Sequence, residues 1–259
     1  MKYYQELIHA NVRLPSPPAI AIKILDTVRR DDFSFKDLAR IIETDPALVA
    51  KILRVANSSY YSFSRKVGNI ETAISILGTH AVKNIALSFV IYSDLKRSEN
   101  KEFDLDLFWR RAITTAVAAE QTAALVGSRS PDIFVTALLQ DIGVIIFIAS
   151  VPERYQLTMN ENLASRTPLH ELERECFGFD HQVLGGELLQ SWRLPDDITI
   201  PIRHHHQQEL IPEGYRVQVE ILQIADALSA IYHGKRSVAK LGVVREKLKS
   251  SFAVEGEQV

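Results

Sequence analysis

This sequence has a single cysteine, a small net charge and no recognisable signal peptide. Cys176 is the only cysteine among the 259 residues, so no disulfide can form within the chain, and we interpret it as an inert thiol. The formal net charge is -2, which gives no broad attraction to nucleic acid or to anionic lipid. No signal peptide follows Met1. We therefore expect a cytoplasmic protein.

Uninterrupted apolar runs and glycine-rich phosphate loops are also missing. A membrane span needs roughly 18 apolar residues, and Gln140 and Asp141 interrupt the best candidate, residues 134–147. Neither the G-x-x-x-x-G-K-[ST] nor the G-x-G-x-x-G loop occurs, and no internal repeat stands out. The chain is nevertheless 46% apolar, enough for a sizeable core. These observations predict no membrane partner and no standard nucleotide loop.

Helical periodicity runs through nearly every segment, and no alternating run is typical of a strand. The sequence therefore predicts an all-α protein. Capping residues and prolines set the expected helices at 18–30, 35–43, 46–57, 70–77, 79–95, 105–126, 134–147, from 152, from 168, 180–192, 195–206 and 217–233. The most polar connection, residues 98–102, predicts a boundary near residue 100 between subdomains 1–100 and 101–259.

The segment 134–147 combines an apolar circumference with three residues that do not suit a core helix, and we expect it to run through the core as one helix. A buried Asp141 carboxylate needs a cation, a metal or hydrogen bonds, since burying it unpaired costs several kcal/mol (order of magnitude). Gly143 costs roughly 1 kcal/mol relative to Ala in a helix, which indicates that another backbone or a ligand comes close. This segment is either a functional site or a structural ion pair beside a close helix crossing.

Residues 37–57 are predicted to form a helix, a tight turn and a second helix. In some DNA-binding proteins the second helix of such a pair enters the major groove. Here only Lys51 and Arg54 could reach DNA from an otherwise aliphatic helix, whereas a recognition helix needs a polar face. A corner of a helical bundle is the favoured interpretation. The following Asn57 to Tyr60 similarly suits a capping and bend network better than ligand contact.

Several dispersed motifs occur in the order found in one family. Residues 45–60 and 70–78 closely resemble the first half of the HDOD family, the HD-related output domains of bacterial signalling. The second half is similar in residues 108–111, 137–143, 179–195, 202–206 and 225–228. The resemblance covers about residues 14–230. It implies an HD-domain-like helical bundle with an N-terminal helical subdomain, and HD-GYP cyclic dinucleotide phosphodiesterases as the nearest catalytic relatives.

The same resemblance implies a degenerate HD site. HD enzymes hold one or two divalent metals with a His, an adjacent His-Asp pair and a later Asp, and these positions fall on Arg111, Gln140, Asp141 and Asp226 of this chain. A guanidinium at Arg111 stays charged and would repel a divalent cation. We therefore expect no catalytic residue and no metal, with Arg111 or a neighbouring donor neutralising Asp141.

Three histidines that resemble second-metal ligands remain. His181, His205 and His206 join Asp141 and Asp226 as a candidate ligand or metal pocket. Because His204, His205 and His206 lie on one helical turn, at most two of them can face one cavity. Four further histidines are interpreted as surface or boundary residues: His9, His80, His170 and His233. Trp109 and Trp192 are interpreted as core anchors.

The resemblance favours a non-catalytic regulatory module that acts through signalling proteins or a bound small ligand. No cofactor is expected, nucleic acid is disfavoured, and a homo-oligomer is left open. Because the match occupies nearly the whole chain, we expect its input to arrive by association. The alternative is a divergent metal-dependent phosphohydrolase acting on a nucleotide or cyclic dinucleotide, with Asp141, His181, His205, His206 and Asp226 as ligands. A second alternative is DNA binding through residues 37–57.

Overall fold

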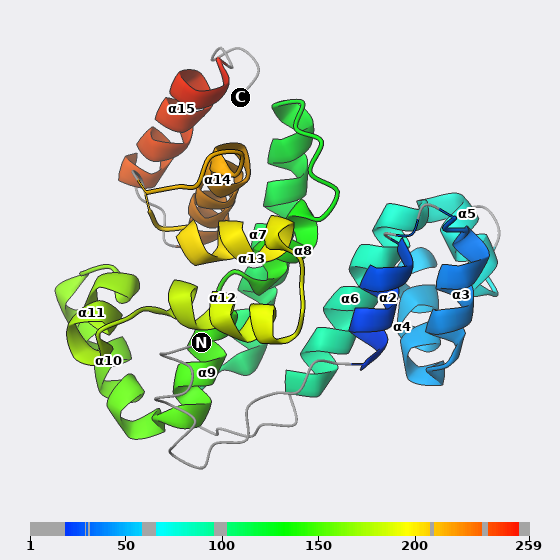
Figure 1. Ribbon diagram of the computed structural model, residues 1–259, viewed down its shortest axis with the longest axis horizontal. Coiled ribbons are helices and arrows are strands. Elements are labelled where there is room, and N and C mark those ends of the chain that lie inside the picture. The colour runs from blue at the N-terminus through cyan, green and yellow to red at the C-terminus, as the bar shows by residue number, and fades with distance from the viewer. Residues whose placement is uncertain are drawn as a thin grey trace. The chain divides into compact units, whose positions relative to one another are not determined.

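A computed structural model describes residues 19–28, 30, 32–58, 66–95, 103–207, 210–234 and 238–253. They belong to two compact units, one containing residues 19–95 and the other containing residues 103–253 (Figure 1). Within these ranges every regular element is a helix, which confirms the predicted all-α class. His9, the bend residues from Ser59 to Phe63 and the connection 98–102 with its predicted boundary lie outside the described residues.

The first unit consists of five described helices that pack around a small aliphatic core. The helices are α2 (Ala19–Val28), α3 (Phe35–Glu43), α4 (Pro46–Ala56), α5 (Ile70–Leu77) and α6 (Thr79–Leu95). Their predicted starts are confirmed by the caps: Asp45 accepts hydrogen bonds from the backbone N–H groups of Ala47 and Leu48, and Asn69 accepts one from Thr72.

The turn after α4 is organised by Asn57. Its side-chain amide donates to the carbonyl oxygens of Leu53 and Val67 at 2.8 and 2.9 Å, and its Oδ1 accepts from the Val67 N–H at 2.8 Å. One side chain therefore joins the end of α4 to the segment that leads into α5. For Asn57 this confirms the predicted bend network.

In the α3–α4 pair, the second helix, α4, packs into the core of the first unit. Leu48, Ile52 and Ala56 of α4 are buried, and α4 contacts α5 and α6. Lys51, one of the two cations considered for DNA contact, places its Nζ 5.2 Å from the centroid of the Phe89 ring. The aliphatic face of α4 thus belongs to the core of this unit.

The second unit contains the rest of the described helices. They are α7 (Leu105–Leu125), α8 (Ile133–Leu139), α9 (Ile142–Ser150), α10 (Pro152–Ser165), α11 (Leu169–Phe177), α12 (His181–Ser191), α13 (Asp196–His204), α14 (Arg216–Tyr232) and α15 (Val238–Phe252). Trp109 and Trp192 are buried, as predicted. Helix α15 was not predicted, and it buries Val244 and Leu248 against Ile224 of α14.

The apolar core segment is not one helix. The helix predicted over 134–147 is divided into α8 and α9, with Gln140 and Asp141 in a turn between them. Contrary to the sequence-based expectation, Ile133–Ser150 is long and apolar enough to cross a membrane by length and composition alone. However, 89% of this segment is buried inside the unit, which is common for the core of a soluble protein.

Helices α9 and α12 approach each other through glycine. A Cβ on Gly143 would lie 2.1 Å from the carbonyl oxygen of His181, and one on Gly185 would lie 3.2 Å from the backbone nitrogen of Gly143. The prediction that another backbone comes close to Gly143 is confirmed. This approach brings the first turn of α12 against the turn that carries Asp141.

Candidate functional site

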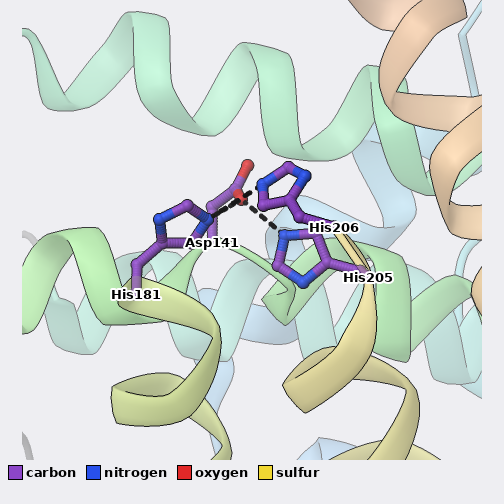
Figure 2. Close-up of side chains that lie close together, drawn as sticks. All are labelled: Asp141, His181, His205 and His206. Atoms are coloured by element: carbon purple, nitrogen blue, oxygen red, sulfur yellow. Dashed lines mark hydrogen bonds and ion pairs between the residues drawn. The ribbon is translucent and has the colours of Figure 1, made fainter. Parts of the chain in front are cut away.

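Four potential metal ligands converge where three connections of the second unit meet. Asp141 lies in the turn between α8 and α9, His181 is the first residue of α12, and His205 and His206 directly follow α13. One ligand atom from each side chain lies within 4.8 Å of the others. Figure 2 shows the four side chains pointing toward one another. We call this set the His-Asp cluster.

The start of α12 is fixed by a buried capping residue. Asp180 accepts a hydrogen bond from the Val183 N–H at 3.1 Å, and Arg174 from α11 pairs with it at 2.6 Å. Gln182 then accepts from the backbone N–H of His206 at 2.7 Å, which ties the end of α13 to the same turn. The backbone of both histidine-bearing segments is therefore held from outside the His-Asp cluster.

His181 is bonded on both ring nitrogens. Its Nδ1 lies 2.5 Å from Oε2 of Glu173, and its Nε2 lies 3.1 Å from Nε2 of His206 and 3.5 Å from Oδ1 of Asp141. Burial alone would lower the pKa of His181, but the carboxylates of Glu173, Asp141 and Asp180 outweigh burial and raise this pKa to about 9. A protonated His181 can thus donate to Glu173 and toward the cluster.

His205 presents its Nε2 to the cluster. Its Nδ1 lies 2.7 Å from the carbonyl oxygen of Ile202, an arrangement that places the proton on Nδ1. Its Nε2 is buried without a hydrogen-bond partner and lies 3.5 Å from Oδ1 of Asp141. A proton on Nε2 that pairs with Asp141, or a cation bound between the two atoms, would satisfy this nitrogen.

His206 and His170 form the outer part of the site. Burial and the nearby charges of His205 and His181 hold the pKa of His206 well below its usual value, which favours the neutral ring. The His170 ring stacks on that of His206 with centroids 4.3 Å apart. His170 was predicted to be a simple surface or boundary residue. It is half-buried, which agrees with a boundary position, but its contact with a member of the His-Asp cluster was not predicted.

Asp141 is held as a carboxylate chiefly by the histidines. Burial would raise its pKa, but contact with His205 and the electrostatic effects of His181, His205 and Arg111 lower this pKa to about 2. Its described ion pairs are those with His181 and His205, at 3.5 Å each. Arg111 therefore acts through space, and the neighbouring donors that approach Asp141 are the two histidines. The carboxylate side chain remains 37% exposed.

The other predicted site residues lie outside this convergence. Gln140 is 1% exposed, and neither polar atom of its side chain has a hydrogen-bond partner. Arg111 of α7 accepts a hydrogen bond at its backbone oxygen from Ser229 of α14 at 3.2 Å. Asp226 is half-buried on α14 and is not among the four residues whose ligand atoms converge. Four of the five residues of the predicted pocket therefore lie together.

Sequence reasoning missed Glu173, the buried carboxylate that contacts His181. It lies in a strongly charged segment, Leu169–Phe177, where an additional Glu gives no signal of burial. It reaches His181 only because the chain reverses at Gly178, whose φ of 81° is in the left-handed region. The contact that makes Glu173 part of the site is therefore visible only in the tertiary structure.

The donor set of the His-Asp cluster fits a transition metal. Three imidazole nitrogens and one carboxylate oxygen suit Zn²⁺, Co²⁺, Ni²⁺ or Fe²⁺, whereas Mg²⁺ and Ca²⁺ prefer oxygen ligands throughout. The buried Nε2 of His205 has no hydrogen-bond partner, and binding to a metal ion would satisfy it. The residues present therefore fit one such ion.

An all-α unit with a His-Asp cluster between its core helices is the architecture expected of an HD-related domain. The chain belongs to the HDOD family: the family model of the HDOD domain matches residues 14–208. The family predicted from dispersed motifs is thus confirmed.

Solved structures share the fold at low sequence identity. An HDOD domain protein of unknown function from Geobacter sulfurreducens is 22% identical, with a TM-score of 0.81 over 96% of this chain and 88% of that chain. A Shewanella amazonensis protein, assigned provisionally as a phosphohydrolase, is 23% identical, with a TM-score of 0.78 over 98% of this chain and 89% of that chain. These likenesses establish the fold.

One curated relative is longer than this chain. An uncharacterized protein from Treponema pallidum is 24% identical over 248 residues, which is 95% of this chain and 47% of the relative. The chain therefore spans about half the length of the curated relative that it matches.

Proposed function

We propose that this protein is a non-catalytic signal-transduction module of the cytoplasm, acting through protein contacts or a bound small ligand. The observation that carries the proposal is that this chain keeps only some of the residues of an HD site. Asp141 faces the histidines, whereas the two positions that resemble the histidine ligands of the HD site hold Arg111 and Gln140. Replacing both histidines, one of them by a permanent cation, disfavours a two-metal centre.

A second candidate function, metal binding without hydrolysis, is favoured by the His-Asp cluster itself. Its four ligand atoms converge, and His205 keeps a buried nitrogen free of hydrogen bonds. The sequence favoured the absence of metal, but this geometry supports one transition-metal ion. His181, His205, His206 and Asp141 would hold it, and it would supply positive charge beside the Asp141 carboxylate. In metal-free protein, the proton on His181 supplies that charge.

The test combines metal content with phosphodiester hydrolysis. Full-length protein purified without chelator or metal-affinity tag is analysed for bound metals, then assayed with bis(p-nitrophenyl) phosphate and a cyclic dinucleotide in the presence of Mn²⁺, Fe²⁺ or Zn²⁺. We expect no turnover above that of Asp141→Ala. One ion per chain, lost in His181→Ala, would support the metal-binding candidate.

Hydrolysis that disappears in Asp141→Ala would contradict the non-catalytic proposal and favour the phosphohydrolase alternative. Two ions per chain would favour the same alternative. DNA binding is the weakest candidate, because α4 buries Leu48, Ile52 and Ala56 and extends Lys51 over Phe89. Affinity for duplex DNA that falls steeply with salt would revive it.

A further inference from the structure

Glu173 of α11 carries a fully buried carboxylate that contacts His181 of the His-Asp cluster. Its Oε2 accepts a hydrogen bond from the backbone N–H of His181 at 2.8 Å and lies 2.5 Å from Nδ1 of the same residue. Both the start of α12 and the His181 ring are therefore oriented by one carboxylate oxygen.

The second oxygen of Glu173 is held from α10. Tyr155 donates its hydroxyl hydrogen to Oε1 of Glu173. Tyr155 is itself fully buried, and its ring stacks on Phe147 of α9 with centroids 4.9 Å apart and planes 6° apart. Because Tyr155 is packed and Glu173 is bonded at both oxygens, neither side chain can turn without breaking contacts in the core.

From this arrangement we infer that Glu173, held by Tyr155, is the positioning residue of the metal-binding cluster. A histidine that binds a metal through Nε2 must carry its ring proton on Nδ1, and an acceptor at Nδ1 fixes both that proton and the ring plane. Glu173 supplies this acceptor, so that Nε2 of His181 faces His206 and Asp141. The inference rests on the metal-binding candidate proposed above.

A purely structural role for Glu173 predicts a different result. The carboxylate also accepts from the N–H of the first residue of α12, which satisfies an unpaired donor at a helix start. If this were its whole contribution, substitution would lower stability equally with and without metal. A positioning role additionally weakens metal binding and alters the ligand field of the bound ion.

The experiment uses Co²⁺ as the probe, because its visible absorption reports the number and kind of its ligands. Full-length wild type, Glu173→Gln, Tyr155→Phe and His181→Ala are titrated with Co²⁺. Glu175→Gln is the matched control, since it removes the same charge from an exposed position on α11.

We expect Glu173→Gln to weaken Co²⁺ binding by about 10–100-fold and to change the absorption bands, because outer-shell partners of metal-bound histidines have effects of this size. Tyr155→Phe should act in the same direction by a smaller factor, and Glu175→Gln should match wild type. Should Glu173→Gln fail to fold, Tyr155→Phe carries the test, because it removes a single hydroxyl.

Two failures are distinguishable. If wild type binds Co²⁺ in a His181-dependent manner but the affinities and spectra of Glu173→Gln and Tyr155→Phe equal those of wild type, the positioning role is refuted and the metal site stands. If wild type binds no more Co²⁺ than His181→Ala, the metal-binding candidate fails and the positioning role fails with it.

Discussion

Replacing Gly143 by Ala should destabilise the second unit even though Ala is the better helix former. A Cβ at this position would lie 2.1 Å from the carbonyl oxygen of His181, and the next nearest atoms are also backbone atoms of His181. Ordinary contact begins near 3.5 Å, so α9 and α12 would have to separate by roughly 1.4 Å. No side chain can rotate to relieve this overlap.

Two opposing effects set the magnitude. Ala gains about 1 kcal/mol over Gly in helix propensity. Overpacking a core costs about 1–3 kcal/mol and more where the backbone must move, so we expect a net loss of about 2 kcal/mol in the free energy of unfolding. For a unit of this size, such a loss lowers the melting temperature by about 4–8 °C. Displacing His181 should also weaken any metal binding.

The assay is thermal and urea unfolding followed by circular dichroism, with Gly242→Ala as the matched control. Gly242 also lies inside a helix, α15, but a Cβ there would meet nothing within 4 Å. We expect this control to raise stability by about 0.5–1 kcal/mol. If Gly143→Ala were as stable as wild type or more stable, the close crossing of α9 and α12 would be refuted.

Two further predictions concern the bend after α4 and the titration of the cluster. Asn57→Ala should destabilise the first unit by about 1–3 kcal/mol, because it leaves the Val67 N–H and two carbonyl oxygens without this partner; equal urea midpoints for variant and wild type would contradict this. In metal-free protein, the raised pKa of His181, about 9, contributes stability that is present below about pH 6.5 and is lost as the pH rises through 9. In urea melts at different pH, we expect the free energy of unfolding to fall by on the order of 3 kcal/mol across this window, and to change less in Glu173→Gln. A free energy of unfolding that stays constant in wild type from pH 6.5 to 9 would refute the assignment.

Local sequence signals predicted most helix limits because capping residues act on their own neighbours. Asp45 and Asn69 start α4 and α5 as expected, since each side-chain oxygen binds N–H groups two or three residues away. The break after Leu139 was not predicted, because the apolar residues on both sides of Gln140 and Asp141 continue the helical pattern. Helix α15 was also missed, since its hydrophobic side chains reveal their face only against α14.

The candidate site was predicted in part. His181, His205, His206 and Asp141 were identified through a family resemblance, and three separate connections bring them together. Asp226 was predicted from motif order, which carries no distances, and it is not among the four converging residues. Glu173 and His170 were missed because their roles depend on how α11 packs beside α12 and on the stacking of two rings.

The sequence by itself determined the helical class, most helix ends, the family and the close approach at Gly143, because each depends on local backbone preferences or on the order of motifs. Only the tertiary structure decided that the polar residues of the core segment lie in a turn, that histidines rather than Arg111 contact Asp141, and that Glu173 orients His181. Those features depend on distances between segments that are remote in the chain, and packing alone fixes these distances.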